Sequence, residues 1–321
     1  MRTPPTRARR AVTLALALAA GAGAAAGYET DQYSNRLAPI ADAAPVLDRQ
    51  VNGTLAEVAA AWRGPEDRWR FARKVYWRLG GIYWVDKVEK FAVESPEIER
   101  LPQFRHESIF AAAPVYATRV NWFFGVGATI RLAGSLVGTD KLGHFFSQGL
   151  KYYGSHLIGW DDRHVYGRGR FNERWLFGQL TTSVYSNADL VANYEGYRFY
   201  LSLYESGIVP GKGPIVAFRD SRATIERPFA WADHVNDYWD EAAFPSHLSP
   251  DLERYLLGAL PRLCPEFARD PAAFLPKREA ELAERYRDVG LKPAPELRMD
   301  RICGAPGDPD GGTTGRAEPG R

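Results

Sequence analysis

The chain has 321 residues, of which 45% are hydrophobic and 25% charged, with a formal net charge of +2. This composition is typical of a folded protein, and nine Trp, sixteen Tyr and sixteen Phe residues can build a sizeable core. Nucleic-acid binding usually requires a basic surface, which a nearly neutral chain lacks, so we expect no nucleic-acid partner.

The first 26 residues have the pattern of a secretory signal peptide. Four arginines within positions 2–10 precede an apolar run from Ala11 to Ala20, and small residues then provide an Ala-x-Ala cleavage site ending at Ala26. Removing residues 1–26 changes the formal net charge from +2 to −2. We predict a periplasmic protein. The alternative is an inner-membrane protein anchored by the uncleaved segment, although the apolar run is short for a span.

Helix start and stop signals predict a mainly α fold, a single-domain helical bundle over residues 27–303 with long irregular loops. The signals mark three helices: one starting at Gly64 to Asp67 and stopped by Gly80-Gly81, one starting at Ser249-Pro250, and one from about Lys277 to Asp288. The tail, residues 304–321, is rich in Gly and Pro and is predicted to be disordered.

The composition of three segments in the middle of the chain predicts a hairpin or loosely packed helix, a loop, and irregular structure. Residues 116–138 mix aromatic residues, β-branched residues and four glycines, which fits either a short β-hairpin or a loosely packed helix. Residues 161–171 are polar and rich in Gly and Arg, which favours a loop. Residues 207–228 have the composition of a long excursion with little regular structure.

Two polar stripes, about fifty residues apart, interrupt segments that otherwise have the pattern of apolar helices. Helical spacing puts the first stripe on one side of its helix: Asp140, His144, Ser147, Gln148 and Lys151. The second helix is expected from about Glu173 to Tyr204, and one of its faces carries Ser186, Asp189, Asn193 and Gly196. Because such polar groups are costly to bury without partners, we expect the stripes to face each other and form a site.

The residue types in the stripes suit two chemistries. Asp140, His144 and Asp189 form a ligand set for a divalent metal such as Zn²⁺, Mn²⁺ or Fe²⁺. In the other chemistry, His144 is a general base oriented by Asp140 or Asp189, and Lys141 or Asn193 steadies an oxyanion. A third interpretation makes the stripes a structural network that locks two helices together.

Two glycines inside the first polar segment, Gly143 and Gly149, lower the stability of an exposed helix by about 1 kcal/mol each relative to alanine. Such glycines indicate that another backbone or a ligand comes close to this helix.

The motif Asp140-Lys141-x-x-His144, followed by Asp189-x-x-x-Asn193-x-x-Gly196, resembles the paired motifs of the VanZ-like family and of small bacterial envelope lipoproteins. The resemblance covers about sixty residues of the chain. It implies a cell-envelope setting, a shared polar site, and an envelope lipid or glycan as the natural substrate.

Cys264 and Cys303 are the only cysteines, and an even pair in an exported protein predicts one disulfide. The leading hypothesis is an exported envelope hydrolase that uses His144, Asp140, Asp189, Asn193 and Lys141 and acts on a lipid or glycan. The alternative is a non-catalytic envelope-biogenesis protein that binds lipid or another protein. Peripheral membrane association is compatible with both, and the sequence makes no prediction of oligomeric state.

Overall fold

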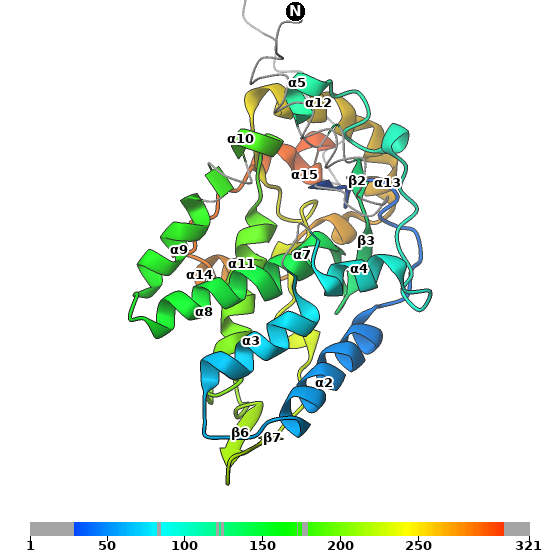
Figure 1. The fold of residues 1–321 in the computed structure, drawn as a ribbon. Coiled ribbons are helices and arrows are strands. Elements are labelled where there is room, and N and C mark those ends of the chain that lie inside the picture. The colour runs from blue at the N-terminus through cyan, green and yellow to red at the C-terminus, as the bar shows by residue number, and fades with distance from the viewer. Residues whose placement is uncertain are drawn as a thin grey trace, which may run out of the picture.

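The computed structural model describes residues 29–81, 85–119, 122, 125–171, 173–174 and 179–304. The predicted signal peptide, and the predicted disordered tail apart from Gly304, lie outside these residues. The described part is mainly helical, as predicted, with only short strands (Figure 1). Among the described helices, none combines the length and the apolar character needed to cross a lipid bilayer.

The α-helices follow one another along most of the chain. They are α2 (Ala44–Ala60), α3 (Arg68–Leu79), α4 (Lys87–Glu94), α5 (Val115–Thr118), α7 (Asp140–Gly143), α8 (Gly149–Leu157), α9 (Asp162–Phe171), α10 (Gln179–Thr182), α11 (Asn187–Ser202), α12 (Pro250–Ala259), α13 (Cys264–Arg269), α14 (Glu279–Arg285) and α15 (Met299–Ile302). A π-helical turn, η2 (His144–Gln148), joins α7 to α8. Two 3₁₀ turns, η4 (Trp231–Asp233) and η5 (Asp237–Trp239), lie between α11 and α12 in the chain.

The strands form four two-stranded pairs among the described residues. The parallel pair is β1 (Glu29–Thr30) with β2 (Val126–Gly127). The antiparallel pairs are β3 (Thr129–Leu132) with β4 (Ser135–Gly138), β5 (Val184–Tyr185) with β8 (His247–Leu248), and β6 (Val216–Arg219) with β7 (Arg222–Ile225). For residues 116–138 the sequence allowed either a hairpin or a loosely packed helix. The β3–β4 pair shows that the second half of this region is a hairpin.

The helix signals located most elements correctly. Helix α3 begins one residue after Asp67, whose side chain accepts a hydrogen bond from Arg70 N (2.8 Å) and so caps the helix. The helix ends before Gly80, as predicted. Helix α12 begins at Pro250, after Ser249, whereas α14 is shorter than its prediction at both ends.

Two predictions in the middle of the chain are wrong. The second motif helix begins at Asn187 instead of near Glu173, because β5 pairs with β8 and the Ser186 hydroxyl caps the helix by accepting from Asp189 N (3.1 Å). Residues 161–171 are a helix, α9, and not a loop: Asp161 caps its start through His164 N (2.9 Å). The excursion at 207–228 contains the β6–β7 hairpin.

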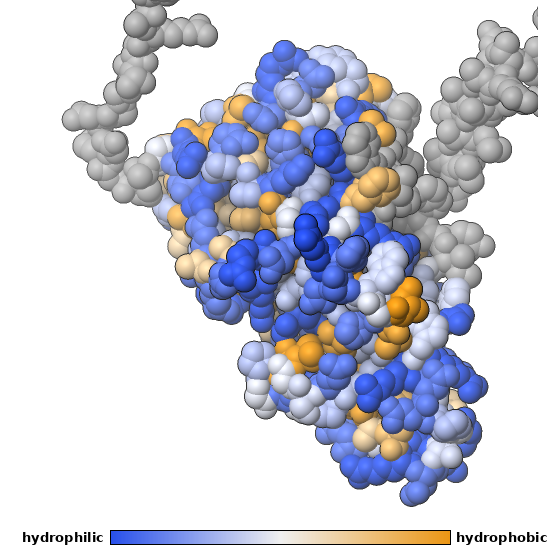
Figure 2. Space-filling model, turned by 90° about the vertical axis from the view of Figure 1, so that its left-hand side faces the viewer, coloured by the Kyte–Doolittle hydropathy of each residue, from blue (hydrophilic) through white to orange (hydrophobic). Residues whose placement is uncertain are grey.

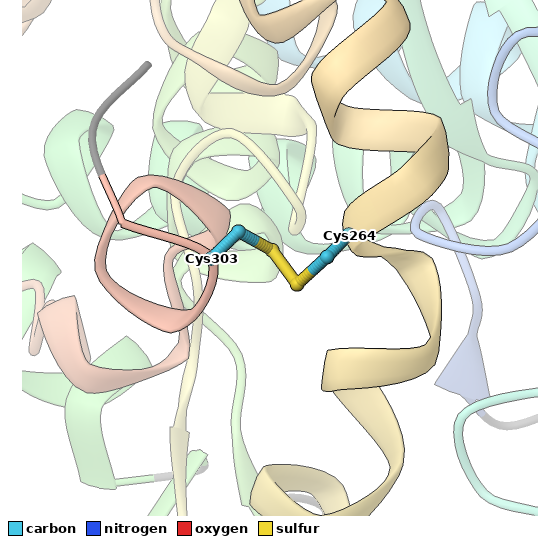
Figure 3. The surroundings of a disulfide bond; sticks show 2 residues. All are labelled: Cys264 and Cys303. Carbon is cyan, nitrogen blue, oxygen red and sulfur yellow. A yellow bond between two sulfur atoms is a disulfide. The ribbon is translucent and has the colours of Figure 1, made fainter. Parts of the chain in front are cut away.

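Helix α11 lies at the centre of the larger of two hydrophobic clusters and packs against η2, α8 and η5. The smaller cluster gathers the C-terminal helices around the segment near Tyr33. The predicted disulfide between Cys264 and Cys303 is present and ties α13 to the residue that follows α15 (Figure 3). The single-domain organisation stays a prediction.

Candidate functional site

The two polar stripes face each other where η2 crosses α11. The crossing is close, because a side chain at Gly196 would overlap the Phe145 carbonyl and one at Gly149 would overlap the Gly196 backbone. The expectation that another backbone approaches Gly149 is therefore confirmed. Gly143 makes room for side chains: a Cβ there would lie 3.3 Å from carboxylate oxygens of Asp86 and Glu89.

His144 and Asp189 meet at the centre of the crossing. His144 Nε2 lies 3.2 Å from Asp189 Oδ2, and His144 Nδ1 lies 3.1 Å from Asn193 Oδ1. His144 stands at the start of the π-helical turn, and such turns occur frequently at functional sites. The His144 side chain is 25% exposed and that of Asp189 is 14% exposed, so the pair is open to solvent on one side.

Lys141 is buried behind this pair and holds two carboxylates. Its Nζ lies 2.7 Å from Asp140 Oδ2, 2.6 Å from Asp189 Oδ1 and 3.8 Å from Glu241 Oε1. Burial lowers the pKa of Lys141, but the charges of Asp140 and Asp189 outweigh burial and raise that pKa well above its usual value. The ammonium group is therefore the permanent counter-ion of the site.

Glu173 completes a group of three that the sequence prediction did not include. Ligand atoms of His144, Glu173 and Asp189 all lie within 4.8 Å of one another. Burial, together with the negative charge of Asp189, raises the pKa of Glu173 well above its usual value. Asp140 does not belong to this group of three, and its Oδ2 pairs with Lys141, so its role as a metal ligand stays a prediction.

Two more buried carboxyl groups border the site from distant parts of the chain. Glu29 lies on β1, and its pKa is raised well above the usual value by burial and by the charge of Glu241. Glu241 accepts hydrogen bonds from Ser186 Oγ (2.9 Å) and Ser246 Oγ (3.1 Å). Neither glutamate has a sequence spacing that would have indicated the site.

A further carboxyl pair lies on the other side of η2. Ser147, on the first stripe, donates a hydrogen bond to Asp86 Oδ2. Burial raises the pKa of Asp86 to about 6. Burial and the charge of Asp140 raise the pKa of Glu89 to about 8. Ser147 is thus engaged by a carboxylate rather than by a histidine, which removes the usual activation of a serine nucleophile.

The hydrogen bonds of His144 restrict what its imidazole can do. A neutral imidazole has one N–H, which lies either on Nδ1, where it donates to the Asn193 carbonyl oxygen, or on Nε2, where it donates to the Asp189 carboxylate. In the tautomer with the N–H on Nδ1, the Nε2 lone pair points at the Asp189 carboxylate, an arrangement that a metal ion between the two atoms would stabilise. Neighbouring ligand atoms of a tetrahedral zinc ion, with bonds of about 2.0–2.1 Å, are about 3.3 Å apart. The 3.2 Å separation between Nε2 and Oδ2 fits that geometry.

All five residues predicted for the site gather around the η2–α11 crossing: Asp140, Lys141, His144, Asp189 and Asn193. Comparison of the chain with protein-family models, with curated proteins and with solved structures finds no match.

Proposed function

We propose that His144, Glu173 and Asp189 bind a divalent metal ion and that the site is the centre of a metal-assisted hydrolase. The observation that carries the proposal is the convergence of one imidazole and two carboxylates within 4.8 Å, where Glu173 is buried and the side chains of His144 and Asp189 are partly exposed. This donor set suits Zn²⁺, Mn²⁺ or Fe²⁺. A bound ion of this kind polarises a substrate oxygen and lowers the pKa of a bound water.

The surrounding residues orient the ligands. In the tautomer that would bind the ion, Asn193 Oδ1 accepts from His144 Nδ1, and the Nε2 lone pair is directed toward Asp189 Oδ2. Lys141 binds the other oxygen of the same carboxylate, Oδ1, and so leaves Oδ2 for the ion. This geometry favours the metal chemistry over His144 as a general base, because a base needs a free lone pair directed at the substrate.

The setting and the substrate class belong to the proposal as well. The signal-peptide pattern of residues 1–26 supports export to the periplasm, and the Cys264–Cys303 disulfide suits an oxidising compartment. The resemblance to the VanZ-like motifs supports an envelope lipid or glycan as substrate. Peripheral association with the membrane fits both substrate classes.

The metal content of three purified proteins tests the proposal. We expect about one Zn, Mn or Fe per chain in the wild type by elemental mass spectrometry, and less than about a tenth of that in Glu173→Gln. Glu241→Gln is the matched control, because Glu241 is also a buried glutamate near Lys141 but is outside the group of three. We expect this control to keep the metal of the wild type.

A different outcome would favour the alternative, a non-catalytic protein in which these side chains form a structural network. Its support is the complete pairing of buried Lys141 with carboxylates. In that case neither the wild type nor the two variants binds metal when supplied with each of the three ions. Glu173→Gln then differs from the wild type only in its free energy of unfolding.

A further inference from the structure

Helix α3 presents an exposed face that is both aromatic and strongly basic. Its twelve residues include five cationic side chains and no acidic one, in a chain whose formal net charge is only +2. Its buried side is apolar, with Phe71, Ala72, Val75 and Leu79 in the core. Trp69, Arg73 and Trp77 follow one another at every fourth position on the outer side, where both tryptophans are exposed.

The exposed face continues onto the end of α8. Trp69 packs over this helix, because a Cβ at Gly154 would meet its ring at 3.0 Å. Its ring centroid lies 6.4 Å from that of Tyr153. One turn beyond Gly154, three large apolar side chains project into solvent: Leu157, Ile158 and Trp160, with Ile158 73% exposed. Figure 2 shows the side of the molecule on which α8, α9 and α3 lie, where apolar patches interrupt a largely hydrophilic surface.

We propose that this surface, defined as Trp69, Arg70, Arg73, Trp77, Ile158 and Trp160, docks on an anionic lipid bilayer. Tryptophan is favoured at the level of the lipid headgroups, and apolar tips such as Ile158 insert between the acyl chains. The arginines between the tryptophans attract anionic lipids. Arg73 and Trp69 would meet the bilayer together, because the Arg73 guanidinium carbon lies over the Trp69 ring, 6.0 Å from the ring centroid.

Charge complementarity selects the bilayer as the occupant of this surface. A protein partner would bury a continuous apolar patch, whereas here each exposed aromatic side chain alternates with a cation along α3. Large apolar side chains flanked by fixed positive charge are the pattern of helices that lie in a membrane interface.

Partitioning of the purified protein onto lipid vesicles tests the proposal. One vesicle preparation contains phosphatidylcholine and phosphatidylglycerol in equal parts, and the other contains phosphatidylcholine alone. We expect binding to the anionic vesicles that weakens as salt is raised, and at least about tenfold weaker partitioning for Arg70→Glu/Arg73→Glu. The double variant Arg222→Glu/Arg301→Glu, with the same change in net charge at exposed positions elsewhere, is expected to keep wild-type binding.

The apolar contribution is tested by Trp77→Ala/Ile158→Ser, which keeps the charge and is expected to weaken partitioning several-fold. Phe104→Ser is its control, because Phe104 is 57% exposed and belongs to a different element, next to the turn at Arg105–Glu107. Equal binding to both vesicle types overturns the proposal. Equal loss in the test and control variants, or binding to a soluble anionic polysaccharide but not to vesicles, overturns it as well.

The result of the vesicle experiments does not depend on whether the proposed metal site exists. Ile158, which belongs to this surface, is fourteen residues from His144, just past the end of the helical segment that contains η2 and α8, a distance of about 21 Å. We therefore expect the surface variants to keep the wild-type metal content, and Glu173→Gln to keep the wild-type partitioning onto vesicles.

Discussion

Helix α11 takes part in two histidine–carboxylate pairs that differ in their surroundings. At one, His144 lies 3.2 Å from Asp189, both side chains reach solvent, and the buried carboxyl of Glu173 stands close by. At the other, His234 lies 3.1 Å from Glu195, and these side chains are 1% and 0% exposed. The distances are almost the same, so the distance alone does not tell a binding site from a structural pair.

The completeness of the hydrogen bonding separates the two pairs. Glu195 Oε1 accepts from Tyr286 OH (2.8 Å), and arginine side chains approach both carboxylate oxygens, Arg198 at 3.5 Å and Arg285 at 3.8 Å. Burial raises the pKa of Glu195, but the hydrogen bond and charge of His234 outweigh it and lower that pKa below its usual value.

The imidazole of His234 is equally well enclosed. It stacks on Phe229 with ring centroids 5.6 Å apart, and the rings of Phe145 and Phe199 also contact it. Such a pair has no free position for a ligand. Excess carboxylate and solvent access therefore distinguish the His144 region, where we propose the metal ion, from the enclosed pair of His234 and Glu195.

The largest expected effect is at the structural pair. Glu195→Ala leaves His234 and two arginines without their buried counter-charge, and we expect it to lower the free energy of unfolding by about 3–5 kcal/mol. Urea denaturation measures the change. Glu284→Ala is the control, because Glu284 is exposed and pairs with the exposed Arg287, so we expect a change below about 0.5 kcal/mol. Similar losses in both variants would contradict the structural role of Glu195.

The next effect is a pH dependence that belongs to the His144 region. The pKa of Glu89 is raised from 4.5 to about 8 by burial and by Asp140, so the folded protein holds a proton that the unfolded chain releases above pH 4.5. This contribution to stability is present below pH 4.5 and is lost as pH rises toward 8.

Between pH 4.5 and pH 8 we expect the free energy of unfolding of the wild type to fall by an amount on the order of a few kcal/mol. Glu89→Gln mimics the neutral carboxyl, so we expect this variant to lack that fall. Urea denaturation at a series of pH values measures it. Glu195→Gln is the comparison, since the pKa of Glu195 is lowered and its charge is needed in the fold. If Glu89→Gln keeps the wild-type pH dependence, Glu89 is not the group responsible.

The smallest effect on stability is expected at the proposed site. His144→Ala removes a partly exposed ring, and Asp189 keeps its ion pair with Lys141, so the free energy of unfolding should fall by about 1 kcal/mol. We expect the metal to be lost in the same variant. His234→Ala should cost more stability and leave the metal in place. The reverse order of the two stability losses would remove the distinction between the pairs.

The sequence predicts the facing stripes because local spacing decides them. The helical period of 3.6 residues per turn puts Asp189 and Asn193 on one face of α11. Gly149 and Gly196 allow η2 to come close to that helix. Glu173 could not be found in this way, since it reaches His144 only after β5 pairs with β8 and α11 begins at Asn187. That pairing joins residues more than sixty positions apart, and no local pattern encodes it.

The position of β1 could not be predicted for a similar reason. A strand of two residues has no local signal for docking, yet β1 pairs with β2 and brings Glu29 to the site. A buried ion pair between Arg36 and Asp240, with a closest distance of 2.6 Å, holds the same segment across 204 positions of the sequence. The sequence predicts a loop at α9 because residues 161–171 are polar and rich in Gly and Arg. The structure buries Val165, Tyr166 and Gly169 and stabilises that helix by packing.

The most direct test of the account is anomalous diffraction from crystals of the wild-type protein soaked with Zn²⁺ or Mn²⁺. We expect an anomalous peak about 2.0–2.2 Å from His144 Nε2 and from carboxylate oxygens of Glu173 and Asp189. A soaked crystal without a peak, in which His144 and Asp189 simply share a proton, would contradict the metal centre.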